Sequence, residues 1–159
     1  MRFDKTFDFH FKAVPMGRPR FSRKGNVYEP EDCEAYKTKL KLGMVGGMRG
    51  IKPLDEPTVI EIGYYFAMPA GLSEKKKIER FMTPCTNAKD LDNLDKAVLD
   101  AMKGIVLKDD HKVVCLKSHK MNTFFDFIEV RVRSWESFVL DPTLGGLSFA
   151  CERETRAER

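Results

Sequence analysis

Two groups of aspartates are the residues of this sequence best suited to chemistry. Asp90 and Asp92 begin a short acidic segment, and the pair Asp109 and Asp110 follows further along the chain. Mg²⁺ takes about six oxygen ligands and usually keeps several waters, so two or three carboxylates suffice when a substrate phosphate completes the shell. A metal held in this way serves phosphoryl-transfer chemistry. The sequence therefore predicts a metal site made by Asp90, Asp92 and one or both of the later pair.

A lysine follows the first group at helical spacing. Lys96 lies one turn after Asp92, where its ammonium group can neutralise charge developing on a phosphate or help to position the attacking water. Asp95 and Asp100 are weaker candidates, because polar helix surface or an ion pair with Lys96 explains them. Acidic helices with lysines are common, so spacing alone leaves open the alternative that the cluster is only a charged surface.

The first aspartates stand at the start of a predicted amphipathic helix. Asp90 occupies the N-cap position and Gly104 the position just past the helix end. Backbone N–H groups at such a start face an incoming phosphate. The short apolar run 105–107 is interpreted as a strand, and the segment is long enough to bring Asp109 and Asp110 back toward the helix start. The apolar face of the helix consists of Leu91, Leu94, Val98 and Met102.

A basic arm precedes this helix. From Phe9 to Tyr28 the chain has no acidic residue, and two prolines and a glycine between 15 and 19 favour a stiffened loop. Arginine makes planar, bidentate contacts with phosphate, so the arm suits a nucleic-acid backbone. A solvated, positively charged loop is the alternative. The candidate DNA-binding residues are Lys12, Arg18, Arg20, Arg23 and Lys24.

The overall composition is that of a single globular domain. The chain has 159 residues and a formal net charge of +4. Its four cysteines lie far apart without metal-ligand spacing, which favours reduced thiols. An apolar leader and a membrane-length apolar run are both missing, so we expect a cytoplasmic protein. Residues 1–135 are expected to form the domain, and the turn-rich, charged residues 136–159 a poorly ordered tail.

Alternation of apolar residues predicts the remaining elements. Two helices are expected at about 30–42 and 73–82, with a flexible connection after Gly46 and Gly47. The fold class predicted is α/β (α+β), a small mixed sheet flanked by helices. The strands are expected at 3–14, 58–68, 112–119 and 124–134.

The order of these motifs resembles the RusA family of Holliday junction resolvases. The matching signature is Asp-x-Asp-Asn-Leu-x-Lys at 90–96, a Leu-Asp-Ala-Met segment at 99–102, and an aspartate pair followed by a strand. The basic arm with Gly17-Arg18-Pro19-Arg20 agrees with the arm typical of that family. The resemblance covers residues 5 to 134 and leaves the tail outside.

The resemblance implies a homodimer that cleaves four-way DNA junctions by paired symmetric nicks with Mg²⁺ or Mn²⁺, in DNA recombination and repair. Asp90, Asp92 and Asp110 match the family's catalytic carboxylates, and Lys96 matches its catalytic lysine. Asp109 is a weaker candidate. Two alternatives stay open: a dimer that binds branched DNA without cleaving it, and a metal-dependent nuclease directed at flaps or forks.

Overall fold

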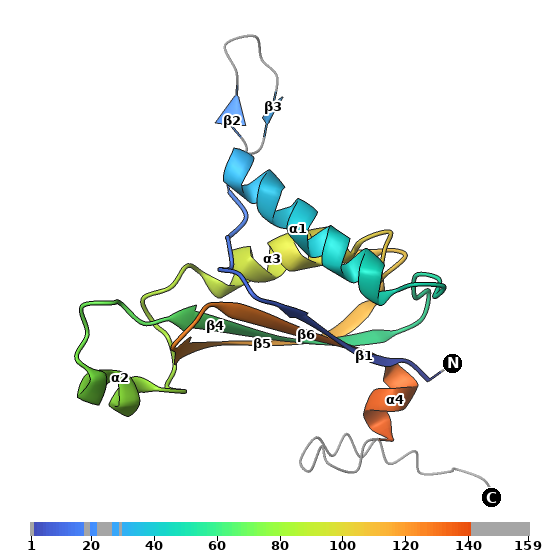
Figure 1. The fold of residues 1–159 in the computed structure, drawn as a ribbon. Coiled ribbons are helices and arrows are strands. Elements are labelled where there is room, and N and C mark those ends of the chain that lie inside the picture. The colour runs from blue at the N-terminus through green and yellow to red at the C-terminus, as the bar shows by residue number, and fades with distance from the viewer. Residues whose placement is uncertain (1, 18–19, 22–26, 29, 141–159) are drawn as a thin grey trace, which may run out of the picture.

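A four-stranded mixed sheet forms the body of the molecule (Figure 1). The computed structural model describes residues 2–17, 20–21, 27–28 and 30–140. The strand order is β1-β6-β4-β5; β4 and β5 are parallel, and the other neighbours are antiparallel. The predicted mixed α+β class is therefore confirmed. The strands are β1 (Asp4–Phe9), β4 (Thr58–Ala67), β5 (Val113–Thr123) and β6 (Phe127–Ser134).

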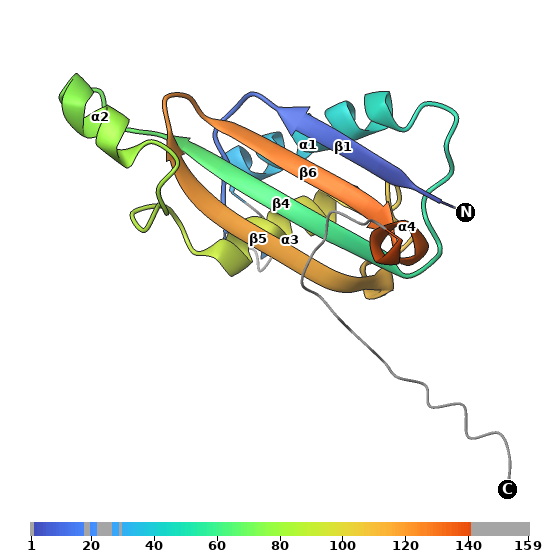
Figure 2. The same cartoon turned by 90° about the horizontal axis from the view of Figure 1, so that it is seen from below.

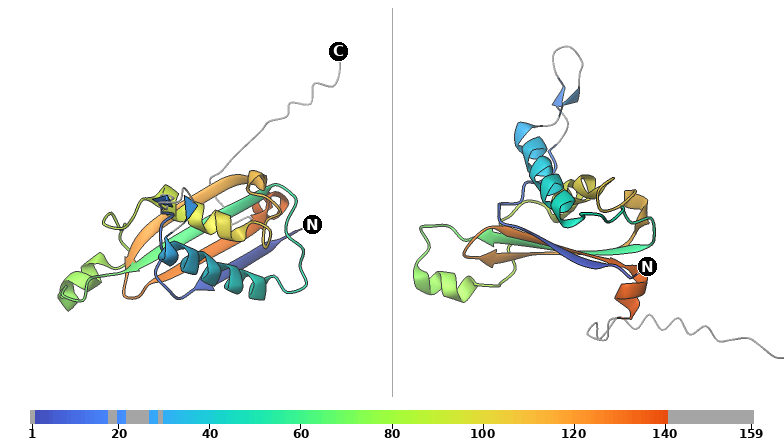
Figure 3. Two further views of the ribbon diagram at one scale, coloured as in Figure 1. Left: turned by 90° about the horizontal axis from the view of Figure 1, so that it is seen from above. Right: turned by 45° about the vertical axis from the view of Figure 1, so that its right-hand side comes forward.

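Two helices cover one face of this sheet, α1 (Glu31–Gly47) and α3 (Leu91–Met102) (Figures 1 and 3). Figure 2 shows the opposite face, where α4 (Trp135–Val139) lies against one end of the strands. The helix α2 (Glu74–Arg80) stands beyond the other end of the sheet. The smaller elements are the 3₁₀ turn η1 (Asp110–Lys112) and the two-residue strands β2 (Arg20–Phe21) and β3 (Val27–Tyr28).

The hydrophobic core lies between the sheet and the two helices. Alternate residues of β4 point toward α3 and are fully buried, and the predicted apolar stripe of α3 meets them. The removal of such apolar side chains from water is the main favourable term in folding. The contributing residues include Leu40, Met44, Ile60, Ile62, Tyr64, Leu94, Val98 and Met102.

Glycines of α1 allow this helix to pack closely on β1. A Cβ atom at Gly43 would lie 2.6 Å from a ring carbon of Phe9, and one at Gly47 would lie 2.6 Å from a ring carbon of Phe7. The helix therefore continues through Gly47, and the predicted helix end near residue 42 is wrong. Helix propensity disfavours these glycines, but tertiary packing outweighs it.

Several predicted boundaries differ from the structure. The first strand ends at Phe9 rather than Val14, and β5 continues to Thr123. The run 105–107 makes only isolated bridges through Leu107, so the predicted short strand there is wrong. Ser73 occupies the predicted N-cap of α2, but its side chain makes no capping hydrogen bond.

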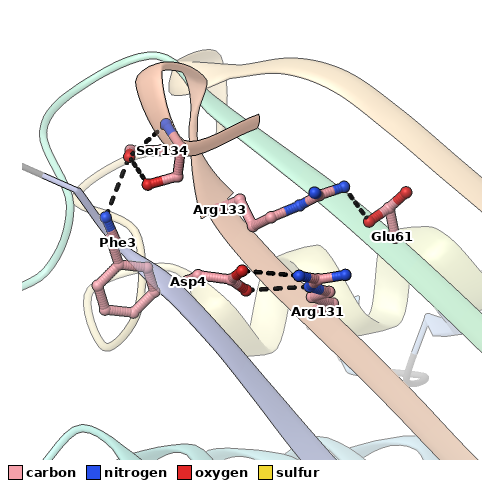
Figure 4. Close-up of polar contacts among 7 residues, drawn as sticks. Phe3, Asp4, Glu61, Arg131, Arg133 and Ser134 are labelled. Carbon is pink, nitrogen blue, oxygen red and sulfur yellow. Dashed lines mark hydrogen bonds and ion pairs between the residues drawn. The ribbon is translucent and has the colours of Figure 1, made fainter. Parts of the chain in front are cut away.

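Paired charges on the open face fix β6 to its neighbours (Figure 4). Arg131 forms two hydrogen bonds with Asp4 of β1, with N–O distances of 3.0 and 2.7 Å. Arg133, which is 1% exposed, contacts Glu61 of β4 at 2.5 Å and lies over the ring of Phe138 in α4. Bidentate and buried guanidinium contacts of this kind specify strand register.

The chain beyond Ser134 contributes a helix that the sequence did not predict. Ser134 accepts a hydrogen bond from the backbone of Ser137, and Phe138 is buried against the sheet. The rest of the predicted tail, residues 141–159, lies outside the described residues. Within the described ranges, no helix combines the length and hydropathy needed to cross a membrane.

Candidate active site

Asp90 and Asp92 lie where α3 begins, as the sequence predicted. Asp90 is the N-cap residue by backbone conformation, but its carboxylate accepts no hydrogen bond from the first turn. Both side chains are exposed. The positive end of the α3 helix dipole and the first free backbone N–H groups of α3 are at the same helix terminus as these two carboxylates. An exposed carboxylate pair is thus placed beside backbone donors suited to a phosphate.

Asp95 lies beneath this pair and fixes it to the sheet. It is only 7% exposed and accepts hydrogen bonds from the Tyr64 hydroxyl at 2.9 Å and the Ser118 hydroxyl at 2.7 Å. Burial raises the pKa of its carboxyl, with a smaller contribution in the same direction from the nearby Asp92. The interpretation of Asp95 as polar helix surface is wrong. Its spacing of four residues from Leu91 places it on the apolar face, which was the available signal.

Tyr64→Phe is expected to lower the free energy of unfolding by about 1–2 kcal/mol, because it removes a hydrogen bond to a buried carboxylate. Urea unfolding followed by circular dichroism measures this change. The matched control is Tyr65→Phe, on the opposite face of β4, where the hydroxyl lies 3.4 Å from His119 in an exposed contact. That variant should stay within about 0.5 kcal/mol of the wild type. Equal losses for both variants would mean that the Asp95 contact contributes nothing specific.

The second aspartate pair lies at the other end of α3. Lys103, the residue just past the helix, contacts Asp109 at 2.6 Å and Asp110 at 3.7 Å. Asp109 also accepts a hydrogen bond from the backbone of Asp110 at 2.9 Å and thereby caps η1. The Lys103 ammonium, together with these hydrogen bonds, holds the pKa of Asp109 well below its usual range. Asp110 is exposed.

The prediction that Asp109 and Asp110 return to the helix start within one chain is wrong. A helix of twelve residues is about 18 Å long. Ser118, which contacts Asp95, lies about 16 Å along β5 from Val113, the first residue of the strand, which directly follows the turn that contains Asp110. Because α3 runs antiparallel to both β4 and β5, its two ends lie at opposite ends of these strands. In the part of the chain that the structure describes, no three His, Cys, Asp or Glu residues form a metal-binding group.

The segment that leads into Asp90 is anchored to β5. The Lys120 ammonium donates a hydrogen bond to the carbonyl oxygen of Lys89 at 2.9 Å. Lys96 is exposed on α3, one turn beyond Asp92. Exposed lysine side chains therefore lie on the same helix and segment as the two carboxylates.

The basic arm leaves the domain beside the same helix start. The backbone N–H of Met16 donates to the carbonyl oxygen of Asn93 at 2.8 Å, and Lys12 is exposed. Arg20 pairs with Tyr28 through β2 and β3, so part of the predicted loop is a hairpin. The predicted DNA-binding residues Arg18, Arg23 and Lys24, and the side chain of Arg20, lie outside the described residues.

An acidic helix start, a parallel β-α-β crossover and the first part of the basic arm thus lie together in an α+β domain. The family model for endodeoxyribonuclease RusA matches residues 10–133. The chain is also 30% identical over 133 residues to the uncharacterized protein YqaN of Bacillus subtilis (strain 168), a match covering 80% of this chain and 94% of that protein. The chain belongs to the RusA endodeoxyribonuclease family, and the resemblance seen in its motifs is confirmed.

Proposed function

We propose that this protein is a divalent-metal-dependent endonuclease that resolves four-way DNA junctions by paired symmetric nicks, in recombination and repair. One observation carries the proposal. In a chain of the RusA endodeoxyribonuclease family, Asp90 and Asp92 lie exposed at the N-terminus of α3, and the Asp90 carboxylate makes no capping hydrogen bond there. Carboxylates that have no structural partner in the helix are available to a cation. Backbone donors beside them suit the phosphate to be cut.

The chemistry of the donor set fits Mg²⁺ or Mn²⁺. Asp90, Asp92 and Asp110 offer carboxylate oxygens, which hard divalent cations prefer, and all three are exposed. A cation bound there would stabilise the charge on the phosphate as a Lewis acid. It would also lower the pKa of a water bound to it, so that a hydroxide nucleophile forms near neutral pH. Lys96, one turn beyond Asp92, would contribute a further positive charge near the phosphate.

The separation of these carboxylates supports a site shared between two subunits. Asp110 lies past the end of α3, about a helix length from Asp90 and Asp92. In a two-fold dimer with antiparallel α3 helices, the start of one helix meets the end of the other. Each site would then combine Asp90 and Asp92 with Asp110 of the partner subunit. Two such sites related by a two-fold axis suit a junction whose strands share that symmetry.

The basic arm would hold the phosphate backbone. Arg18→Ala combined with Arg20→Ala should weaken junction binding and flatten its dependence on salt, because each lost phosphate contact changes the log–log slope by about 0.9. Binding of a labelled junction between 50 and 300 mM salt, without divalent metal, measures the slope. Arg49→Ala, an exposed site after α1, is the control. A slope unchanged by the double substitution would remove the arm from the interface.

A cleavage assay tests the function directly. The full chain is incubated with a synthetic mobile four-way junction, a flap and a linear duplex, with Mg²⁺ or Mn²⁺. Paired nicks at symmetric positions of the junction are expected. Binding without nicking under either metal would favour the non-cleaving dimer, and preferred cleavage of the flap would favour the flap- or fork-directed nuclease.

A further inference from the structure

A cavity of about 430 Å³ lies next to the segment that leads into Asp90. Its volume is within the range of small-molecule sites and exceeds what one nucleobase occupies. A second cavity of about 250 Å³ adjoins it and shares three of its lining residues, Arg80, Asn87 and Asn122. Neither cavity contains any of the carboxylates assigned to the metal, so the proposed chemistry does not use them.

The topology places this cavity at the end of the sheet where α3 begins. Its lining combines the carboxyl end of β4, the loop that follows α2, and the first part of the basic arm. In sheets with parallel strands, ligands bind outside the carboxyl ends of those strands, beside helix N-termini. The cavity wall at Asn87, Ala88 and Lys89 continues directly into Asp90. A molecule bound in the cavity would therefore touch the segment that carries the first carboxylate.

Hydrogen bonds to β5 hold the outer wall in place. Backbone bonds join Met82 and Cys85 to the carbonyl oxygens of Asn122 and Lys120, both at 2.9 Å. The side-chain amide of Asn122 donates to Thr83 and to the carbonyl oxygen of Pro84. Met82 has a φ of 57°, in the left-handed region that a residue with a side chain rarely adopts. The loop is thus fixed by several bonds in a conformation that costs energy, as expected of a preformed site.

The lining suits a flat, apolar ring with polar edges. Phe66 and Cys85, each 8% exposed, form an apolar interior, and Asn87 adds an exposed amide that can donate and accept. Lys12 and Arg80 place cations at the rim. The two acidic side chains in the lining already accept backbone hydrogen bonds, Asp32 from Cys33 and Asp126 from Ala67. Apolar faces, an amide edge and nearby cations are the groups that bind an unstacked base and its phosphate.

We propose that this cavity receives one unstacked nucleobase of the bound DNA beside the phosphate to be cut, with Asn87 contacting the base edge and Lys12 and Arg80 contacting the adjoining backbone. The inference rests on the proposed nuclease function and deepens it. Junction shape would bring the protein to the crossover, and the cavity would select which base there permits cleavage. Asn87 is then a residue that determines specificity, distinct from the carboxylates.

The test is the distribution of nicks on four-way junctions whose crossover sequence is randomised. The wild type should prefer one base at a fixed position next to the nick. Asn87→Ala should reduce that preference by about tenfold, since a side-chain amide contributes roughly this much discrimination. Total junction binding should stay within about twofold of the wild type. Thr38→Ala, on the exposed side of α1, is the matched control and should keep the wild-type preference.

A second measurement keeps the inference separate from the nuclease proposal. Without divalent metal, the wild type should bind a junction with natural bases about tenfold more tightly than one with abasic crossover nucleotides, and Asn87→Ala should narrow this difference. Nicking with an unchanged base preference in Asn87→Ala would overturn the cavity proposal alone. The absence of nicking on every DNA would overturn the nuclease proposal and with it the selection of a cleavage site by the cavity, while the metal-free comparison would still decide whether the cavity binds a base. Equal affinity of the wild type for natural and abasic junctions would again overturn the cavity proposal.

Discussion

Asp92→Asn is expected to reduce junction nicking by about 10³-fold or more while junction affinity changes by less than about threefold. The substitution keeps the shape of the side chain and its place in the first turn of α3, but removes the charge that a divalent cation requires. Asp90→Asn should behave in the same way. Single-turnover cleavage with protein in excess separates the chemical step from binding, and a gel-shift assay without metal measures affinity.

The matched control for this loss is Asp100→Asn on the same helix. Asp100 is half-buried two turns beyond Asp92 and has no place in the proposed site. It should nick within about twofold of the wild type, because its carboxylate is not one of the proposed metal ligands. The control is matched because its substitution removes the same charge from the same helix. Thermal unfolding of all three variants checks that each is folded. Cleavage that survives in both Asp90→Asn and Asp92→Asn would rule out the carboxylate–metal mechanism.

The fold was largely predictable because its main elements carry clear periodic patterns. The apolar stripe of α3 and the alternation in β1 each describe one face buried against the core, and the residues of β4, which are largely apolar on both faces, predict its central place in the sheet. The length of α1 was not predictable, because Gly43 and Gly47 disfavour a helix until the rings of Phe7 and Phe9 occupy the space beside them. The helix α4 was missed because its stability depends on contacts of Phe138 with Arg133, a residue of β6.

The candidate site was predictable only where its residues are local in sequence. Asp90, Asp92 and Lys96 share one helix, so their spacing alone sets their arrangement. The position of Asp110 depends instead on the direction of α3 relative to β5, which follows from the parallel pairing of β4 with β5. The role of Asp95 likewise depends on Tyr64 and Ser118, which lie on different strands. Topology, rather than composition, decides both.

The direction of α3 leads to a test of the shared site by mixing two inactive proteins. Asp92→Asn and Asp110→Asn are each expected to be inactive as homodimers, because both sites of each dimer lack one carboxylate. Refolding or co-expressing them at equal amounts produces mixed dimers as about half of the population. In a mixed dimer with shared sites, one site carries both substitutions and the other carries neither. Nicking should therefore reappear at about a quarter of the wild-type level.

The form of the product distinguishes this restored activity from contamination by wild type. A mixed dimer has one intact site, so it should leave junctions nicked on a single strand, whereas the wild type is expected to make paired nicks that resolve the junction into linear duplexes. If each site instead took all its carboxylates from one subunit, every site of the mixed dimer would carry one substitution and no activity would return. Mixing Asp90→Asn with Asp92→Asn is the negative control, since both residues lie at the start of the same α3. Their mixed dimers lack a complete site under either arrangement. Activity that returned in this control would show that mixing restores nicking without a complete set of carboxylates, and would contradict the shared site.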